Sequence, residues 1–267
     1  GVFRAISVSA PEASILNPVL PAACAARALT GYRVVDAMFG ALAQIVPDRI
    51  PAAGEGGNTV VCLGGYRDDG SPFIIVDMIC GAWGARPNKD GIEGVTNPSQ
   101  NLSNTPVETL ESQHPVRVEE YALVPNSCGA GRWRGGLGLS RSYRVLAKEA
   151  GLQLRADRMR FRPYGLQGGR EAPGSKNTLV EANGETHLLP SKVNRQMYEG
   201  DLIHHIQPGG GGFGDPMTRD PIRVAADVWN EKISAVYARD EHGVIVDGLT
   251  GELDQVATAD LRASLGK

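Results

Sequence analysis

Glycine and proline interrupt this sequence so often that long helices are excluded over most of its length. The 267 residues include 34 glycines and 17 prolines, roughly a fifth of the chain against a usual share of about 12%. They follow no collagen-like period, and they favour turns between short extended segments. A hydrophobic share of 42% is enough to bury a core. The pattern predicts a strand-dominated α+β fold rather than a helical bundle.

Hydrophobic periodicity assigns most segments to strands. Strands are expected over residues 2–8, 59–65, 73–79, 116–123, 137–145, 152–156, 178–181, 187–189 and 202–207. The pairs Asp69-Gly70 and Asn183-Gly184 stand between neighbouring strands and predict tight hairpins, because both pairs tolerate the positive φ angles of such turns.

One long helix is predicted near the N-terminus, with Thr30 as its cap and Pro47 after its end. Its apolar positions are spaced by four, four and three residues, as in a core helix: Val34, Met38, Leu42 and Ile45.

Short helices are predicted near the C-terminus, over residues 222–231, 234–240 and 254–265. Asp220 caps the first of them and Pro221 takes its first helical position. The chain is therefore expected to divide into a helix-plus-β body over residues 1–218 and a helical tail over residues 219–267.

The charge pattern disfavours a nucleic-acid partner. The net charge is −3, and the chain contains no dense run of lysine and arginine. The nearest approach to such a run is a group of four arginines within eight residues: Arg155, Arg158, Arg160 and Arg162. We interpret them as solvated or ion-paired, with phosphate binding as the less favoured alternative.

The sequence also favours a cytoplasmic location without membrane insertion. No run approaches the roughly 18 apolar residues of a membrane helix, and no secretory signal opens the chain. The four cysteines are widely spaced, without a CxxC pattern, and we interpret them as reduced buried thiols: Cys24, Cys62, Cys80 and Cys128. The chain begins with Gly1 rather than methionine, which suggests a piece of a larger assembly.

The run from Pro208 to Pro216 is the most conspicuous motif. Its glycines formally satisfy GxGxxG, but a dinucleotide fingerprint needs a helix that opens inside the motif, and none can begin before about Pro221. A phosphate-loop Lys-Ser/Thr pair is also missing. We interpret the run as a structural turn or interface element, with a ligand cradle as the less favoured alternative.

No metal or nucleophile motif stands out in this chain. His204 and His205 would point to opposite faces of a strand and could not share a metal. HxxxH, HExxH and GxSxG patterns are missing. Cys80 and Cys128 have no adjacent histidine or helix start to lower the thiol pKa. A complete metal site from this chain alone is not expected.

The stretch 81–108 lacks periodicity and is rich in polar residues, and loops of that length are usually functional or disordered. Arg86 could grip a carboxylate or phosphate. Its asparagines suit the edge of a cyclic amide, and its acids could serve as a base: Asn97, Asn101 and Asn104, and Asp90, Glu93 and Glu108. From the residues alone, a substrate site in this stretch is as well supported as the alternative, in which its asparagines and glycines only form turns.

Several short motifs together resemble the hydantoinase B/oxoprolinase family from residue 1 to about residue 245. The matching motifs are Leu16-Asn17-Pro18, Arg33-Val34-Val35-Asp36-Ala37, Trp83-Gly84-Ala85-Arg86, Asn104-Thr105-Pro106-Val107-Glu108, Gly131-Arg132-Trp133-Arg134-Gly135-Gly136, Leu189-Pro190-Ser191-Lys192 and the glycine run. Each motif is weak alone, but their order and spacing make the set specific.

The resemblance implies one part of a multi-subunit, ATP-dependent enzyme that opens hydantoins, 5-oxoproline or other lactams. ATP and a divalent metal are expected on partner chains, because family members bind nucleotide on a hydantoinase A-like ATPase subunit. The motifs that resemble metal ligands lie in an N-terminal hydantoinase B-like half, which this chain lacks. The chain would then be the C-terminal half, inactive alone.

The resemblance also implies roles for residues of the matched polar stretch. Glu108 and Asp90 would be catalytic, and the substrate would be bound by Arg86, Asn97, Asn101, Asn104 and Thr105. Two other functions remain open: a subunit of an ATP-dependent ketone carboxylase of the acetone type, and a non-catalytic scaffold of the complex. A stand-alone binding module is the least favoured hypothesis.

Overall fold

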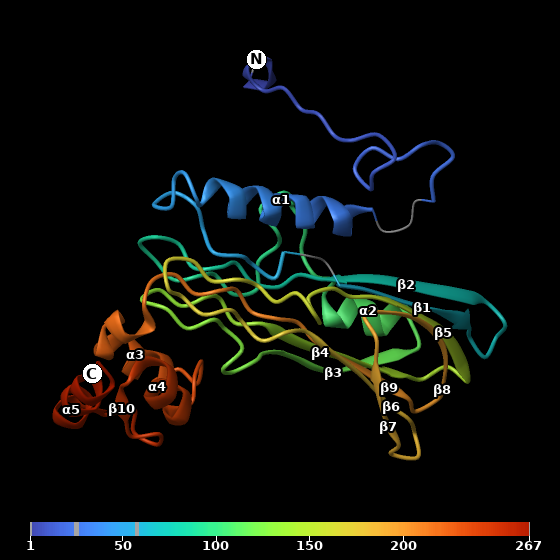
Figure 1. Ribbon diagram of the computed structural model, residues 1–267. Helices are drawn as coiled ribbons and strands as arrows, with labels where there is room; N and C mark the ends of the chain where they lie inside the picture. Colours follow the sequence, from blue (N-terminus) through green and yellow to red (C-terminus); the bar gives the residue numbers. More distant parts are fainter. Residues whose placement is uncertain (1, 24–26, 57–58, 267) are drawn as a thin grey trace.

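Two antiparallel sheets pack face to face in the structure, a computed structural model that describes residues 2–23, 27–56 and 59–266 (Figure 1). The first contains β1 (Thr59–Tyr66), β2 (Pro72–Ile79), β5 (Glu149–Arg155) and β8 (Lys192–Tyr198), in the order β2-β1-β5-β8. The second contains β3 (Val116–Leu123), β4 (Leu139–Val145), β6 (Lys176–Val180), β7 (Thr186–Leu189) and β9 (Leu202–Ile206), in the order β3-β4-β9-β6-β7.

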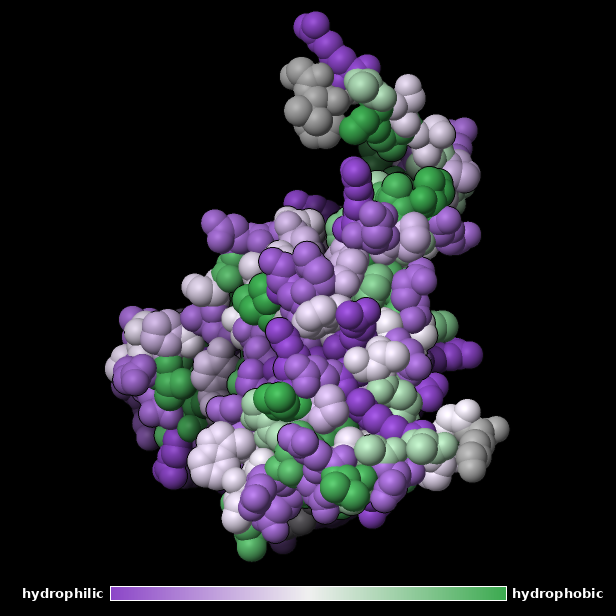
Figure 2. Space-filling model, turned by 90° about the vertical axis from the view of Figure 1, so that its left-hand side faces the viewer, coloured by the Kyte–Doolittle hydropathy of each residue, from purple (hydrophilic) through white to green (hydrophobic). Residues whose placement is uncertain are grey.

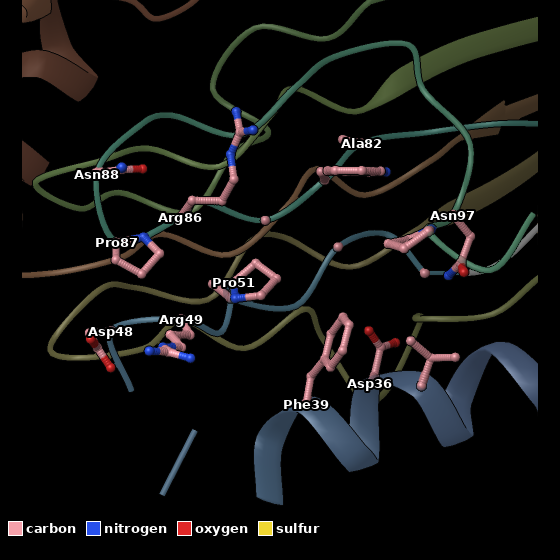
Figure 3. Close-up of a pocket in the computed structure, with 17 residues that line it drawn as sticks. Asp36, Phe39, Asp48, Arg49, Pro51, Ala82, Arg86, Pro87, Asn88 and Asn97 are labelled. Carbon is pink, nitrogen blue, oxygen red and sulfur yellow. The ribbon is translucent and has the colours of Figure 1, made fainter. Parts of the chain in front are cut away.

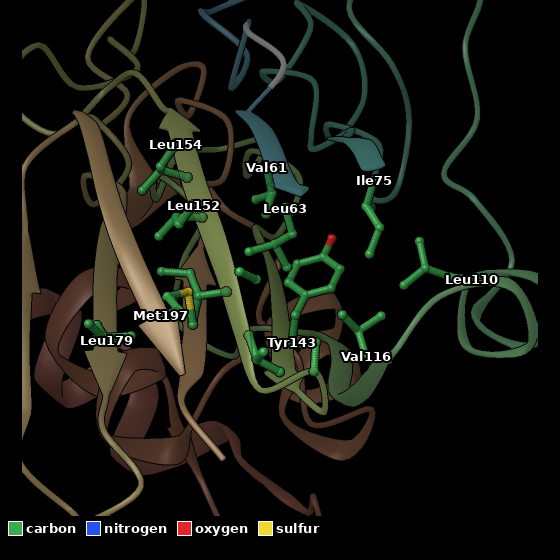
Figure 4. Packing of buried hydrophobic residues seen from close by; sticks show 14 of the residues in the cluster. Val61, Leu63, Ile75, Leu110, Val116, Tyr143, Leu152, Leu154, Leu179 and Met197 are labelled. Atoms are coloured by element: carbon green, nitrogen blue, oxygen red, sulfur yellow. The ribbon is translucent and has the colours of Figure 1, made fainter. Parts of the chain in front are cut away.

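The main core lies between these two sheets. Alternate residues of each strand face inward, so Val61 and Leu63 of β1 are fully buried. They belong to one apolar cluster with Tyr143 of the opposite sheet, as Figure 4 shows. The other labelled members include Ile75, Leu110, Val116, Leu152, Leu154, Leu179 and Met197. This sandwich is the rigid body that carries the loops at its end.

The strands predicted from residue 59 onward are confirmed to within a few residues. Both predicted hairpins are present, and Gly70 and Gly184 take the positive φ angles, 79° and 90°, that tight turns require. The sequence prediction missed β8 and the short helix α2 (Val107–Gln113). β8 lies at the edge of its sheet and alternates only between exposed and half-buried positions for most of its length, which leaves a weak pattern.

The strand predicted over residues 2–8 is wrong. Val2–Ala5 forms a single 3-10 turn, η1, and residues 6–23 continue as an irregular arm that projects from the body (Figure 1). Figure 2 shows the arm at the top of the molecule with several apolar side chains exposed on it. Among the described residues no strand pairs with this arm, so the periodicity of residues 2–8 alone was misleading.

The mixed α+β class is confirmed, but the long N-terminal helix is not. Helix α1 (Ala28–Leu42) has 15 residues and begins before Thr30, and no side chain caps it. The predicted core face is also wrong, because Met38 and Ile45 are exposed. The helix instead buries the face that carries Tyr32 and Asp36. This is possible because Arg158 of the body and Arg33 of the helix itself neutralise the acid.

The glycine run threads between other backbone segments at one end of the sandwich. We call residues 209–214 the glycine seam. A Cβ added at Gly210 would lie 2.2 Å from the carbonyl oxygen of Trp83, and one at Gly211 would lie 2.1 Å from that of Tyr164. Only glycine permits such an approach, so the structural interpretation of this run is confirmed. No helix opens inside it, because the next element is the 3-10 turn η2 (Pro216–Thr218).

Three short helices complete the chain, as predicted: α3 (Pro221–Trp229), α4 (Ala235–His242) and α5 (Gln255–Leu265). Asp220 caps α3 through the amide of Ile222, and a small hairpin joins β10 (Ile245–Val246) to β11 (Leu253–Asp254). Helices α3 and α4 share a second apolar cluster with Cys128 and Leu137 of the body. The division at residue 218 stays a prediction, and the two sides of it are packed together.

Other predictions concern cysteine, arginine and the membrane. Cys62, Cys80 and Cys128 are free thiols, and Cys24 lies outside the described residues. Arg158 and Arg162 are ion-paired, with Asp36 and Glu171. In the part of the chain that the structure describes, every helix is too short or too polar to cross a lipid bilayer.

Candidate functional site

Two cavities lie along residues 80–107, at the loop-bearing end of the sandwich, and share three wall residues: Trp83, Asn97 and Pro98. The first, which we name the α1 cavity, has a volume of 380 Å³ and lies between this stretch and helix α1. The second, which we name the loop cavity, has a volume of 530 Å³ and reaches to Tyr121 of β3. Trp83 therefore forms a partition between them.

The α1 cavity has apolar walls and polar groups toward its two ends (Figure 3). Phe39 points up from α1, and Pro51 faces it. In the same view Asn97 and Asp36 lie toward one end, whereas Arg49 and Arg86 lie toward the other. Such a cavity suits a small organic molecule with an apolar body and polar groups at its edges.

Asn97, which lines both cavities, carries a buried hydrogen-bond donor that has no partner among the described residues. The residue is only 4% exposed. Its Oδ1 accepts hydrogen bonds from the amide and hydroxyl of Ser99, at 2.9 and 2.6 Å, which fixes the side chain. Its Nδ2 is buried and meets no acceptor among the described residues. An unsatisfied buried amide is costly, on the order of 1–3 kcal/mol, so a ligand carbonyl placed here would be favoured.

Asp36 supplies a buried carboxylate in the same wall. Its Oδ2 meets Arg158 Nη2 at 2.6 Å and Arg33 Nη1 at 3.1 Å. Burial raises the pKa of the Asp36 carboxyl above its ordinary value, although both arginines oppose the shift. The Tyr164 hydroxyl donates to the backbone oxygen of Asp36 at 2.7 Å and holds the helix in place. Asp36 can therefore accept a ligand N–H.

Arg86 contributes positive charge near the other end. Its Nη2 donates to the backbone oxygen of Asp90 at 2.8 Å, and its Nε is buried without a partner among the described residues. Arg49 lies exposed at the rim of the same cavity. The two guanidinium groups could attract a carboxylate.

The loop cavity is more polar, but its predicted residues are already occupied. Asn104 accepts a hydrogen bond from the amide of Cys80 at 3.0 Å and donates to the hydroxyl of Tyr121. The backbone oxygen of Thr105 accepts from Arg141 Nη2 at 3.0 Å. Asn104 and Thr105 therefore line this cavity while they tie the polar stretch to the sandwich.

Three of the predicted site residues line neither cavity. Asn101 is exposed on the loop, and Glu108 is exposed in the first turn of α2. Asp90 instead accepts two hydrogen bonds from Arg219, at 2.7 and 3.0 Å. Burial acts to raise the pKa of the Asp90 carboxyl, but the bonds and charge of Arg219 outweigh it and hold the pKa below its usual range. Such a carboxylate is a poor proton acceptor.

Sequence reasoning assigned no site role to four residues that line the α1 cavity: Asp36, Phe39, Arg49 and Trp83. A signal for Asp36 did exist, because it lies one helical turn from Tyr32 and from Phe39 on the same face of α1. An acid among aromatic residues on a helix face indicates a buried, partnered charge. The positions of Arg49 and Trp83 depend on contacts distant in sequence.

The glycine seam is not a nucleotide cradle. Its amides already donate to backbone carbonyls of other segments, for example Gly211 to Ala53 and Gly212 to Arg170, at 2.8 and 2.9 Å. A phosphate would need those same amides. The residues described here therefore do not fit a phosphate group at this motif.

One group in the described part of the chain has the spacing to hold a metal ion: Glu181, Glu185 and His187 on the β6–β7 hairpin. None of the three lines either cavity. Glu181 also meets Arg195 at 2.9 Å, and this neighbouring cation disfavours a bound metal. Within the α1 cavity, Asp36 is likewise neutralised by arginine.

Comparison with known proteins identifies relatives along nearly the whole chain. A family model described as hydantoinase B/oxoprolinase matches residues 1–216. A protein of Pseudomonas sp. (strain NS671), provisionally named as one of the subunits of a D-/L-hydantoinase, is 34% identical over 98% of this chain. The match covers 44% of that relative, so the chain spans less than half of its length.

Two solved structures share the fold. The crystal structure of the ATP-dependent caprolactamase from Pseudomonas jessenii superimposes with a TM-score of 0.72 at 28% identity, covering 84% of this chain and 40% of that one. The nucleotide-free structure of an acetone carboxylase gives a TM-score of 0.69 at 21% identity, covering 81% and 34%. At that identity the second likeness shows the fold alone.

Proposed function

Because this chain belongs to the hydantoinase B/oxoprolinase family, we propose that it supplies part of the substrate site of a multi-subunit, ATP-dependent enzyme that opens a cyclic amide. Its relatives include a protein named as part of a hydantoinase and an ATP-dependent caprolactamase. The names of both relatives refer to cyclic amides. The α1 cavity is the place where such a ring would lie.

The pairing of Asn97 with Asp36 carries this proposal. A ring amide presents its carbonyl oxygen and its N–H side by side on one edge. Asn97 Nδ2 can donate to the oxygen, and the carboxylate of Asp36 can accept from the nitrogen. Phe39 and Trp83 line the same cavity and give the apolar part of the ring its contact surface.

The arginines extend the proposal to a substituent on the ring. Arg86 and Arg49 lie toward the end of the cavity away from Asn97 (Figure 3). A carboxylate attached to the ring would be attracted there, whereas an unsubstituted lactam would leave this end to water. We therefore expect acidic cyclic amides to bind more tightly than neutral ones.

In this proposal ATP and the divalent metal belong to partner chains. The partners would be a hydantoinase A-like ATPase subunit and an N-terminal hydantoinase B-like half. The residues of this chain bind and orient the ring and exclude water from it. Chemistry at the amide carbon would be completed by groups on those partners, so the chain alone would be inactive.

The ketone-carboxylase alternative fits the cavity less well. A ketone has a carbonyl oxygen for Asn97 but no N–H for Asp36. A buried carboxylate without a donor from its ligand would gain nothing from binding a ketone. The Asn97–Asp36 pair therefore favours amide opening.

Binding of lactams and hydantoins to the complex recovered with its co-purifying subunits tests the proposal. Asn97→Asp keeps the Oδ1 acceptor that Ser99 requires and removes the donor. We expect ligand affinity to fall by about 10-fold or more, as when a buried hydrogen bond is lost. Asn101→Asp is the matched control, since Asn101 is exposed on the same loop and outside both cavities.

Equal affinity in the Asn97→Asp complex and the wild type would reject the proposed site. If ring opening also continued normally, the scaffold hypothesis would replace it. Loss of affinity in the Asn101→Asp complex would indicate a general effect of loop charge rather than a lost donor.

A further inference from the structure

Five buried or half-buried charged residues form a connected network beside the α1 cavity: Asp90, Glu93, Arg134, Arg219 and Asp227. We call this network the charge clamp. Arg219 is 1% exposed. Its guanidinium group donates hydrogen bonds to both carboxylate oxygens of Asp90 and to Asp227 Oδ2, the last at 2.7 Å. Arg134 bonds Asp227 Oδ1 at 3.0 Å and Glu93 Oε1 at 2.7 Å. Each carboxylate therefore has at least one arginine partner.

The charge clamp joins three parts of the sequence: the polar stretch, the segment that contains Arg134, and the C-terminal segment. Asp90 and Glu93 belong to the polar stretch that lines the cavities. Arg219 and Asp227 lie beyond residue 216, where the match to the family model ends. Lys232 adds a further contact from the same C-terminal segment, 3.4 Å from Glu93. The C-terminal segment thus holds the polar stretch through charges that the family match does not include.

A short path of contacts leads from the charge clamp to the cavity. Arg219 holds the side chain of Asp90. The backbone oxygen of Asp90 in turn accepts the hydrogen bond from Arg86 Nη2 at 2.8 Å. Arg86 lines the α1 cavity. A movement of Asp90 would therefore displace the guanidinium group of Arg86.

We propose that the C-terminal segment, residues 219–267, positions the substrate site, and that Arg219 is its positioning residue. Arg219 fixes Asp90, and Asp90 fixes the cationic end of the α1 cavity. The effect on ligands rests on the proposed function, but the effect on the polar stretch does not. Asp90, expected from the sequence to be catalytic, becomes a positioning residue in this proposal.

The energetics of buried charge support positioning over simple stabilisation. A buried ion pair often adds no more stability than apolar residues of the same volume, because desolvation offsets the attraction. The C-terminal segment also has an apolar attachment of its own, in which Val224 and Val228 pack with Leu137 and Cys128. Arg223 stacks on Trp133 at 4.9 Å as well. Docking of the segment does not depend on Arg219 alone.

Hydrogen exchange in the full chain tests the proposal without any ligand. Arg219→Lys keeps the charge but cannot bond both oxygens of Asp90, because an ammonium group lacks the planar fork. We expect amides of residues 81–98 to exchange about 10-fold faster or more, whereas those of β1 and β2 stay unchanged. Arg239→Lys is the control, since Arg239 is exposed and contacts only its neighbour Asp240 among the described ion pairs.

Unchanged exchange over residues 81–98 in a folded Arg219→Lys chain would overturn the proposal. Faster exchange in every segment would show a general stabilising role and overturn it too. If Arg219→Lys does not fold, Asp90→Asn replaces it with a changed readout, because this variant also loses global stability. Exchange over residues 81–98 should then rise more than exchange in β1 and β2, and an equal rise in all three would overturn the proposal.

Ligand selectivity provides a second readout in the assembled complex. Arg219→Lys should weaken an acidic cyclic amide about 10-fold more than a neutral lactam of the same ring size, since only the acid needs Arg86. Equal weakening of both would overturn the path through Arg86. If the wild-type complex binds neither ligand, the proposed function fails, and hydrogen exchange still decides whether Arg219 positions the polar stretch.

Discussion

Arg219 and Asp90 are 129 positions apart in the sequence, yet both carboxylate oxygens of Asp90 accept hydrogen bonds from the Arg219 guanidinium, at 2.7 and 3.0 Å. Their contact ties the C-terminal helices to the stretch that lines both cavities. It also explains how a long aperiodic segment keeps a defined shape: its charges are held by side chains from another part of the chain.

Asp90→Asn should lower the free energy of unfolding by on the order of 3 kcal/mol. The substitution leaves the buried Arg219 with one carboxylate fewer, and removal of one partner from a buried pair is costly. Urea denaturation followed by circular dichroism measures the change. Asp240→Asn, an exposed acid on α4, should stay within about 0.5 kcal/mol of wild type. Equal stability of the Asp90 variant would contradict the buried pairing.

Acid should destabilise the fold through His205. Burial lowers the pKa of His205 to about 3, with a smaller effect of His204, whereas an unfolded histidine titrates near about 6.5. Between these values the unfolded chain binds a proton that the native chain does not. Stability is therefore complete above pH ~6.5 and falls as the pH drops toward 3. His242, whose pKa burial lowers to about 4, should act in the same direction.

His205→Gln tests this pH dependence. Glutamine keeps polar contact with Asn177, whose Oδ1 lies 2.7 Å from His205 Nδ1, and it does not titrate. Urea midpoints at several values between pH 7.5 and 4.5 should fall less steeply in the variant than in wild type. Parallel pH profiles would show that His205 is not the buried titrating group.

Gly210→Ala should prevent the native fold or destabilise it severely. The new Cβ would lie 2.2 Å from the oxygen of Trp83 and 2.5 Å from its carbonyl carbon, and both are backbone atoms that cannot move aside. Thermal denaturation measures the loss. Gly31→Ala is the control, because a Cβ there meets no atom within 4 Å and alanine favours the helix by up to about 1 kcal/mol. A stable Gly210→Ala chain would refute the close backbone packing.

Met38→Ala should change the free energy of unfolding by less than about 0.5 kcal/mol in the isolated chain, because the side chain is 57% exposed. Leu63→Ala, at a fully buried position of β1, should cost about 2–5 kcal/mol. The same denaturation experiment compares them. A large loss of unfolding free energy in Met38→Ala would indicate that the face of α1 predicted from the sequence is buried after all.

The sandwich could be predicted from sequence because its information is local. β2 is an almost continuous apolar run interrupted by Asp77, and the turn before it contains Asp69-Gly70. Helix α1 could not be oriented in this way, since apolar residues occupy both of its faces. Its buried face includes Asp36, and burial of that acid depends on Arg158, which is 122 positions away.

In the candidate site, too, some features have a local sequence signal and others depend on contacts distant in sequence. Arg86 and Asn97 were predicted from their chemistry together with the family resemblance, and both line the α1 cavity. Asn101 belongs to the same pattern of asparagines but faces solvent, and periodicity cannot separate such neighbours in an irregular loop. The arginine side chain that holds Asp90 comes from beyond residue 216, so the place of Asp90 in the charge clamp has no local signal.

The glycine seam limits how this protein can diversify. The glycine seam, behind the cavities, contacts its neighbours through backbone atoms. A side chain added there should therefore prevent folding instead of changing the shape of the cavity. Changes in ligand preference would therefore arise from side chains that line the cavity, such as Phe39, Arg49 and Pro87. A backbone layer without room for side chains thus lies directly behind walls built from side chains, so different layers set the fold and the lining of the cavity.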